Sequence, residues 1–237
     1  MTASVDHAGL MDRIYRFQRR FGFYDATRKY YLLGRDPMIE GLNVPAGGTV
    51  LEIGCGTGRN LVMAGRRYPT ARLFGVDISR EMLAAAGDAV LNAGLAERAR
   101  LAFADAAEFD PRRTFGRGTF DRIYLSYAVS MIPQWRQVMQ HATRMLAPGG
   151  ELHVVDFGDL RDRPDWQKRA LYTWLRWYHV TPRPDLFDLC EELAERHGCT
   201  ARRQPLYGGF TWIATIARPD RLLQPVAESL DEGPIAA

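Results

Sequence analysis

Short apolar runs alternate with amphipathic stretches through the middle of the chain, from about residue 49 to residue 157. Continuous apolar runs bounded by turn residues are typical of strands buried on both faces of a parallel sheet. Such runs lie at residues 50–53, 71–76, 100–104, 120–127 and 151–156. Apolar residues at helical spacing predict helices at residues 59–67, 79–92 and 135–146. Strands and helices that alternate in this order indicate a parallel sheet joined by right-handed crossovers.

The pattern changes after the fifth of these strands. Residues 158–184 form an insertion, and residues 185–197 predict one further helix. Two runs at residues 200–207 and 211–217 are expected to close the sheet as an antiparallel pair.

Changes in composition divide the chain into three predicted parts. Residues 1–46 are helical in pattern and end in a turn rich in proline and glycine, so we expect an N-terminal helical lid. The core should span residues 47–218 and contain the insertion at 158–184. Residues 219–237 form an acidic, proline-containing tail that we expect to be loosely held and without catalytic residues.

Composition bounds the class of protein. A chain of 237 residues suits one domain with a substantial core, and a net charge of +3 is too small to indicate nucleic-acid binding. Cys55, Cys190 and Cys199 show neither disulfide nor metal-ligand spacing, so we expect a reducing compartment and no bound metal. The chain has no signal-peptide pattern and no apolar run near about 18 residues, so we expect a cytoplasmic location.

A glycine-rich turn follows the first predicted strand. Glu52 precedes Gly54, Gly56 and Gly58 in the spacing E-x-G-x-G-x-G. Glycine lets a ligand press against the main chain, and the N–H groups of the next helix point to the same place. A dinucleotide loop requires G-x-G-x-x-G, but Arg59 occupies the position of its third glycine. A tight turn without any ligand is the alternative.

Acidic residues stand where the second and third strands end. Asp77 follows the second strand, and Asp105 follows the third. A carboxylate at the carboxyl end of the second strand can accept both hydrogen bonds from a ribose diol. The alternatives are that Asp77 caps the helix starting near Ser79 and that Asp105 is an ordinary turn residue.

The glycine turn and the two strand-end acids together resemble the class I S-adenosylmethionine-dependent methyltransferases. The resemblance implies an α/β, Rossmann-like fold with a seven-stranded, mostly parallel sheet, helices on both faces, and S-adenosylmethionine as cofactor. It further implies that Glu52 lies near the cofactor ammonium, that Asp77 binds the ribose and that Asp105 accepts from the adenine amine. The transferred methyl group should then lie at the end of the fourth strand. The cofactor-binding residues predicted in this way are Glu52, Gly54, Cys55, Gly56, Gly58, Asp77, Ile78, Asp105, Ala106 and Ser126.

The segment after the fourth strand limits the substrate. Enzymes that methylate a base nitrogen often carry an Asn/Asp-Pro-Pro-aromatic tetrad there, whereas residues 126–133 read Ser-Tyr-Ala-Val-Ser-Met-Ile-Pro. The acidic cluster of catechol-type, metal-dependent enzymes is also missing from this part of the sequence. We therefore expect neither a nucleic-acid partner nor metal-assisted transfer.

The N-terminal segment carries a more specific resemblance. The string Tyr-Asp-Ala-Thr-Arg-Lys-Tyr-Tyr-Leu-Leu-Gly-Arg-Asp at residues 24–36, with Gly-Thr-Gly-Arg-Asn-Leu at 56–61, is similar to the methyltransferases of betaine-lipid synthesis. Those enzymes convert diacylglyceryl-homoserine to diacylglyceryl-trimethylhomoserine with three molecules of S-adenosylmethionine. The resemblance spans roughly residues 8–160 and implies an amino-lipid substrate.

Candidate residues for this chemistry come from the same segment and from the fourth strand. An aliphatic amine must lose a proton before methyl transfer, and aromatic walls lower its pKa by desolvation. Tyr24, Tyr31 and Tyr127 are the predicted catalytic residues of such a wall, and half-buried core tyrosines are the alternative. Arg28 and Arg35 are predicted to hold the substrate carboxylate, with solvated charges on a helix face as the alternative.

The insertion contains a predicted helix at residues 166–178, rich in aromatic and basic residues. Its helical spacing places Trp166, Ala170, Trp174, Trp177 and Tyr178 broadly on one side, and Trp174 is our candidate for substrate contact. Such a helix suits an anionic membrane surface on the inner face of the membrane, or it roofs the active site. Phosphatidylethanolamine methylation, C-methylation of a quinone precursor and cofactor binding without turnover are the alternative functions. The sequence does not fix the oligomeric state.

Overall fold

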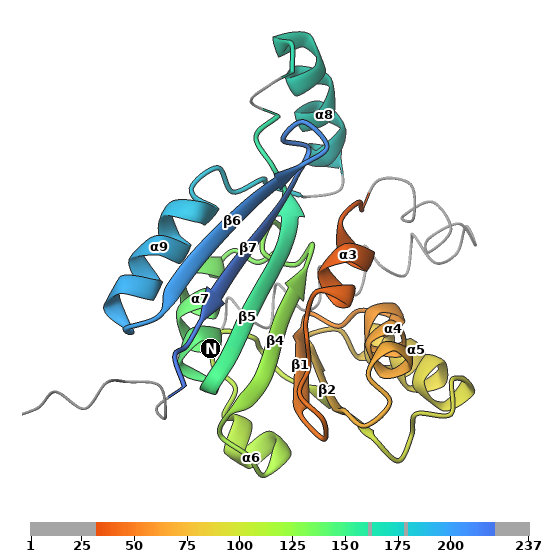
Figure 1. The fold of residues 1–237 in the computed structure, drawn as a ribbon. Coiled ribbons are helices and arrows are strands. Elements are labelled where there is room, and N and C mark those ends of the chain that lie inside the picture. The colour runs from red at the N-terminus through yellow and green to blue at the C-terminus, as the bar shows by residue number, and fades with distance from the viewer. Residues whose placement is uncertain (1–31, 161–162, 178–179, 221–237) are drawn as a thin grey trace, which may run out of the picture.

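The protein is known from a computed structural model, which describes residues 32–160, 163–177 and 180–220. Its centre is a seven-stranded sheet with the order β3-β2-β1-β4-β5-β7-β6, in which β7 alone runs antiparallel to its neighbours (Figure 1). The strands are β1 (Thr49–Ile53), β2 (Arg72–Asp77), β3 (Ala99–Phe103), β4 (Phe120–Ser126), β5 (Leu146–Phe157), β6 (Thr200–Leu206) and β7 (Thr211–Ala217). The predicted fold class is confirmed.

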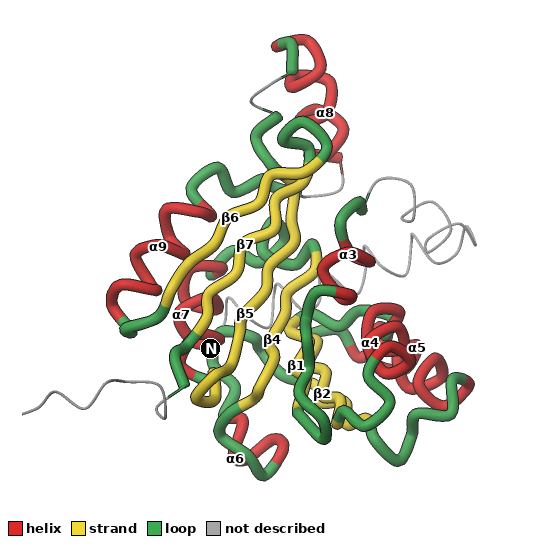
Figure 2. Tube along the Cα trace, viewed as in Figure 1, coloured by secondary structure: helices red, strands yellow, loops and turns green. Residues whose placement is uncertain are grey.

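Helices cover both faces of this sheet. One face carries α3 (Arg35–Glu40), α4 (Arg59–Arg67) and α5 (Arg80–Asn92), and the other carries α6 (Pro111–Phe115), α7 (Trp135–Arg144) and α9 (Leu186–Arg196). Figure 2 shows the first group on the opposite side of the strands from α7 and α9. Because both faces are covered, all five residues of β1 are buried, which explains its unbroken apolar run.

The edge strand β6 differs from the central strands. Its residues are mostly exposed, and it carries Arg202, Arg203 and Pro205. Charges and proline on an edge strand oppose pairing with another chain. The β6–β7 hairpin therefore ends the sheet on this side.

The structure differs from the sequence prediction at two places. The fifth strand begins at Leu146 rather than at Glu151, because residues 146–150 are an irregular part of β5 in which Gly149 has a φ of 71°. Helix α6 was not predicted, although its signals are present in the sequence. Asp110 caps it, Pro111 begins it and Gly116 ends it.

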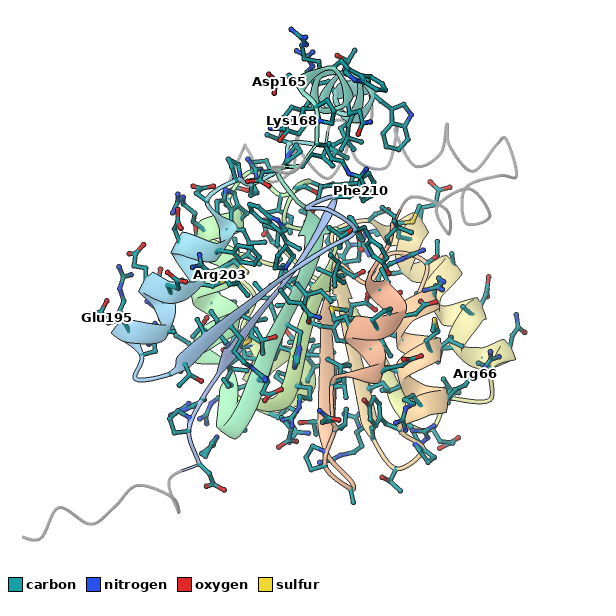
Figure 3. The ribbon with its side chains drawn as sticks, turned by 45° about the horizontal axis from the view of Figure 1, so that its top comes forward. Arg66, Asp165, Lys168, Glu195, Arg203 and Phe210 are labelled. Carbon is teal, nitrogen blue, oxygen red and sulfur yellow. The ribbon has the colours of Figure 1, made fainter. Side chains whose placement is uncertain are left out.

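The insertion forms helix α8 (Asp165–Trp177), which stands beyond the carboxyl ends of the strands (Figure 1). Figure 3 shows Asp165 and Lys168 on this helix and Phe210 below it, in the turn between β6 and β7. Leu175 is buried against the apolar core, whereas Ala170 is exposed and the Trp166 side chain is 65% exposed. Only the C-terminal half of α8 therefore packs on the core, while its N-terminal half is exposed.

The described part of the predicted lid packs onto the sheet. Met38, Ile39 and Leu42 are buried in the same apolar cluster as α4. Residues 1–31 of the predicted lid and 221–237 of the predicted tail lie outside the described residues. Within the described ranges, no helix is long and apolar enough to cross a membrane.

Candidate active site

The candidate site lies where the chain changes direction within the sheet. From β1 the chain moves outward to β2 and β3, and then returns to β4 on the other side of β1. The loops that leave β1 and β4 therefore diverge at the carboxyl ends of these strands. Open α/β sheets bind ligands at such a switch point. The glycine turn, Asp77, Asp105 and Ser126 all lie at this edge.

The three glycines of the turn have positive φ angles of 76°, 52° and 76° at Gly54, Gly56 and Gly58. A Cβ on Gly54 would lie 2.9 Å from the Ala128 Cβ, and one on Gly58 would lie 3.0 Å from Ala86. A Cβ on Gly56 would meet nothing within 4 Å. The outer two glycines thus permit close packing, while the middle one faces open space where a ligand can approach the main chain.

Asp77 is held beside this open space by two backbone groups. The Gly56 N–H donates to its Oδ2 over 2.7 Å, and the Ser79 N–H donates to its Oδ1 over 2.9 Å. Ser79 itself caps α5, since its Oγ accepts from the Met82 N–H. Asp77 is therefore not the cap that the alternative interpretation required. A carboxylate oxygen has two lone pairs, so one that accepts a backbone N–H can also accept a ribose hydroxyl.

The other predicted cofactor residues surround the same edge. Asp105 accepts from the Ala107 N–H over 2.9 Å, which fixes the turn after β3. Ile78 and Ala106 are half-buried, and Cys55 is buried with a thiol pKa raised well above its ordinary value by burial. Among the described residues, the buried Ser126 Oγ has no hydrogen-bond partner. A buried hydroxyl without a partner is uncommon, and a bound ligand or an ordered water is among the groups that could satisfy it.

Glu52 is fully buried below the turn. The Asn60 Nδ2 donates to its Oε1 over 2.9 Å, and the Tyr124 hydroxyl donates to its Oε2 over 3.1 Å. Burial raises the pKa of Glu52 to about 8, although these two hydrogen bonds and the nearby Arg35 oppose the rise. In the absence of a bound cation, Glu52 is thus mainly protonated at neutral pH, and a nearby ammonium would favour its charged form.

Arg35 begins α3 and is only 7% exposed. Its Nε donates to the Leu32 carbonyl over 3.0 Å, and its charge acts on both Glu52 and Tyr127. This burial contradicts the alternative of a solvated charge. The next residue, Asp36, accepts from Arg59 over 2.9 Å and so links α3 to the helix that follows the glycine turn.

Tyr127 follows β4 with a φ of 53°, which is unusual for a tyrosine. Its hydroxyl donates to the Leu33 carbonyl over 2.6 Å and lies 3.0 Å from the Thr211 Oγ1. Its ring packs on Phe157 at a centroid distance of 4.7 Å. Burial raises the pKa of Tyr127, so the hydroxyl keeps its proton. Tyr127 can therefore form part of an aromatic wall, but its hydroxyl is a donor to the α3 segment.

The remaining predicted residues divide into two groups. Trp174 is half-buried on α8 and packs on the apolar cluster that contains Tyr127 and Phe157. Tyr24, Arg28 and Tyr31 lie outside the described residues, so their roles stay predictions.

Three further residues that shape this site are not among the predicted site residues. Tyr124 lies directly opposite Glu52 in the β1–β4 register, and Asn60 reaches the same carboxyl from the first turn of α4. Asp156 is the last residue but one of β5 and a buried carboxylate that accepts from the Ser130 and Phe157 N–H groups. Burial raises the pKa of Asp156 to about 6. An alignment of the predicted strands could have found the Glu52–Tyr124 pair, since parallel neighbours place paired residues on the same face.

Residues 50–150 match the family model described as "Methyltransferase domain". The chain is 34% identical over 121 residues to the methyltransferase GfsG of Streptomyces halstedii, covering 51% of this chain and 42% of that protein. It is 32% identical over 148 residues to a phosphatidylethanolamine N-methyltransferase of Cereibacter sphaeroides, covering 62% of this chain and 68% of that protein. The chain therefore spans less than half of the first relative and about two thirds of the second.

Solved structures show the same fold. An O-methyltransferase family protein from Burkholderia thailandensis superimposes with a TM-score of 0.64 at 19% identity, covering 83% of this chain and 60% of that one.

The residues at the carboxyl edge fit S-adenosylmethionine, and this predicted cofactor is confirmed. The open space beside Gly56 and the unpartnered Ser126 Oγ leave room and a polar contact for it. Asp77 offers acceptors for the ribose, and Glu52 offers a carboxyl that becomes charged near a cation. From its sequence relatives, its fold and the geometry of this edge, the chain belongs to the class I S-adenosylmethionine-dependent methyltransferases.

Proposed function

We propose that this protein transfers methyl groups in succession to the amine of a lipid headgroup, and that its substrate is diacylglyceryl-homoserine in betaine-lipid synthesis. The observation that carries the proposal is the match to a phosphatidylethanolamine N-methyltransferase over 68% of that relative's length. The substrate in that relative's name, phosphatidylethanolamine, carries its amine on a glycerolipid headgroup. The resemblance of residues 24–36 to betaine-lipid enzymes supports the choice of homoserine as the headgroup.

The reaction requires that the substrate amine is neutral. When bound, S-adenosylmethionine supplies a methyl group activated by its sulfonium and becomes S-adenosylhomocysteine. The amine nitrogen forms the new bond with its lone pair, and its proton passes to water. The protein then has to desolvate the amine, align it and exclude side reactions with water.

The apolar surroundings of the carboxyl edge suit this task. Tyr127, Phe157 and Phe210 form a chain of edge-to-face ring contacts there, and Trp174 packs on the same cluster. Desolvation near such rings lowers the pKa of an ammonium, and ring faces stabilise a methylated cation by roughly 0.5–2 kcal/mol. The buried Arg35 supplies a positive charge near Glu52 and Tyr127, which would favour a substrate that also carries a carboxylate.

A mass-spectrometric assay tests the proposal directly. The purified protein is incubated with S-adenosylmethionine and mixed vesicles of diacylglyceryl-homoserine and phosphatidylethanolamine. We expect one, two and three methyl additions on the homoserine lipid alone. Successive methyl additions on phosphatidylethanolamine would support a lipid substrate but replace homoserine as the proposed headgroup. Absence of methylation on both lipids, with cofactor still bound, would contradict the proposal and favour a quinone precursor as substrate or a non-catalytic regulator.

An amino-lipid substrate also requires contact with a membrane, and we propose that α8 makes it. Trp166 is 65% exposed, and Arg169 and Arg176 are exposed on the same helix. An exposed tryptophan with basic residues on the same helix suits the headgroup region of an anionic bilayer. This contact would make the protein peripheral on the inner face of the membrane.

Replacement of Trp166 by serine tests this contact. We expect Trp166→Ser to reduce sedimentation with phosphatidylglycerol vesicles severalfold, because one tryptophan contributes much of the buried apolar area of such a helix. Leu91→Ser is the matched control, since Leu91 is 66% exposed on α5. Equal sedimentation of both variants and the wild type would leave α8 as a roof of the active site only.

A further inference from the structure

A cavity lies at the edge of the sheet opposite to the glycine turn. It has a volume of about 280 Å³ and is formed where β2, β3 and β4 begin. Its walls include Arg72 at the start of β2, Arg100 near the start of β3, and Arg98 and Arg117 from the loops before β3 and β4. Arg72 and Asp77 occupy the two ends of β2, so about 16 Å of strand separates this cavity from the cofactor edge.

Positive charge dominates this cavity. It has four arginines and one acidic residue, Glu97, among its lining residues. In the described part of the chain, neither Arg72 nor Arg100 forms an ion pair with a carboxylate. Because these two side chains are also exposed at the mouth of the cavity, they are available to a ligand.

The other two arginines are fixed in place by main-chain carbonyls. Arg98 donates to the Ala71 carbonyl over 2.7 Å and to the Gly65 carbonyl over 3.0 Å. Arg117 donates to the Thr119 carbonyl over 3.1 Å, and its guanidinium lies 5.4 Å from the Phe74 ring centroid. These contacts hold two charges on the wall without neutralising them.

The charges also act on one another. The pKa of Arg117 is lowered, first by burial and then by the positive charge of Arg72, while Asp121 opposes the change. A group whose charge is disfavoured in this way is stabilised when an anion binds beside it. A bound anion would therefore relieve the repulsion between the positive charges of this cavity.

We propose that this cavity, which we name the arginine pocket, binds a soluble phosphate-bearing anion at a site separate from the cofactor. Guanidinium groups match phosphate oxygens in a planar, two-pronged geometry. The volume is near the lower end of small-molecule pockets, which suits a phosphate or diphosphate group. Phe74 and Phe115 give the pocket an apolar wall against which such a group could carry an organic part.

The position of the pocket favours a soluble anion over a lipid phosphate. Helix α8 stands beyond the carboxyl ends of the strands (Figure 1). The arginine pocket lies at their amino ends. A flat bilayer could not meet both places at once. The choice of a soluble anion rests on the membrane contact proposed for α8. The pocket itself does not depend on the proposed substrate, because it lies at the opposite ends of β2, β3 and β4 from the candidate active site.

Calorimetry with inorganic pyrophosphate at fixed ionic strength tests the proposal. We expect binding to the wild type, and binding that is about tenfold weaker or more in the Arg72→Gln/Arg100→Gln variant, since two charge-assisted contacts are lost. Saturation with S-adenosylhomocysteine should leave pyrophosphate binding unchanged. Arg113→Gln is the matched control, because the Arg113 side chain is 90% exposed on α6 and is absent from the pocket walls.

Three results would overturn the proposal. They are no heat of binding to the wild type, an equal loss in the Arg113→Gln control, or competition with S-adenosylhomocysteine. If instead the double variant reduces sedimentation with phosphatidylglycerol vesicles while pyrophosphate does not bind, the pocket takes lipid phosphate and the soluble ligand is excluded. Cofactor binding by the variant checks its fold, and the single Arg100→Gln variant, at an exposed position, serves if the double variant does not fold.

Discussion

Replacement of Asp77 by alanine is expected to weaken the binding of S-adenosylmethionine about tenfold or more, because two charge-assisted hydrogen bonds to a ribose diol are lost. The carboxylate also accepts from the Gly56 N–H, so its removal frees the middle of the glycine turn. Both effects act on the cofactor-bound state. Titration calorimetry with S-adenosylmethionine and with S-adenosylhomocysteine measures the loss.

Two further variants separate a ribose contact from a general loss of structure. Asp88→Ala makes the same change at an exposed position of α5 and should leave the affinity unchanged. Asp77→Asn keeps one carbonyl oxygen and should fall between the wild type and alanine. Unchanged affinity in Asp77→Ala would remove the ribose assignment.

Replacement of Glu52 by glutamine is expected to stabilise the protein increasingly as the pH rises. Burial raises the pKa of Glu52 from 4.5 to about 8 in the folded protein, so the folded state binds this proton more tightly than the unfolded state. The contribution of Glu52 to stability is therefore fully present below about pH 4.5 and is lost as the pH rises towards about 8. A shift of this size corresponds to a loss on the order of 4 kcal/mol at about pH 8.

Glutamine has nearly the shape of the protonated acid and does not titrate in this range. The difference in unfolding free energy between Glu52→Gln and the wild type should therefore grow between about pH 5 and about pH 8. Denaturant unfolding of the cofactor-free proteins at several pH values measures it. A difference that is constant with pH would show that Glu52 is ionised in the folded protein and that the buried site contains a compensating charge.

The order of the secondary structure could be predicted from the sequence almost completely. The central strands are buried on both faces, so each leaves an unbroken apolar run, and each run lies between recognisable helix or turn signals. Helix α4 was predicted at its observed bounds, Arg59–Arg67. Helix α6 was not predicted because a five-residue helix shows no periodic pattern, although its cap residues can be recognised in the sequence.

The location of the candidate site could also be predicted from the sequence, for a geometric reason. The carboxyl ends of parallel strands meet at one edge, so an acid after each of two strands and a glycine turn after a third must lie together. Asp77, Asp105 and Gly56 follow this rule. The substrate residues Tyr24, Arg28 and Tyr31 lie outside the described residues and stay predictions.

Local pattern thus predicted the strand and helix order and the family correctly, because these depend on neighbours in the sequence, and the cofactor edge stays a prediction. Tertiary structure decided the chemical state of the groups. Burial below the glycine turn raises the pKa of Glu52. Arg35 is buried because α3 packs on the sheet, and the Tyr127 hydroxyl donates to the Leu33 carbonyl. The arginine pocket likewise gathers charges from the starts of three strands. Burial and electrostatic coupling depend on which distant segments meet, and no periodicity along the chain records that.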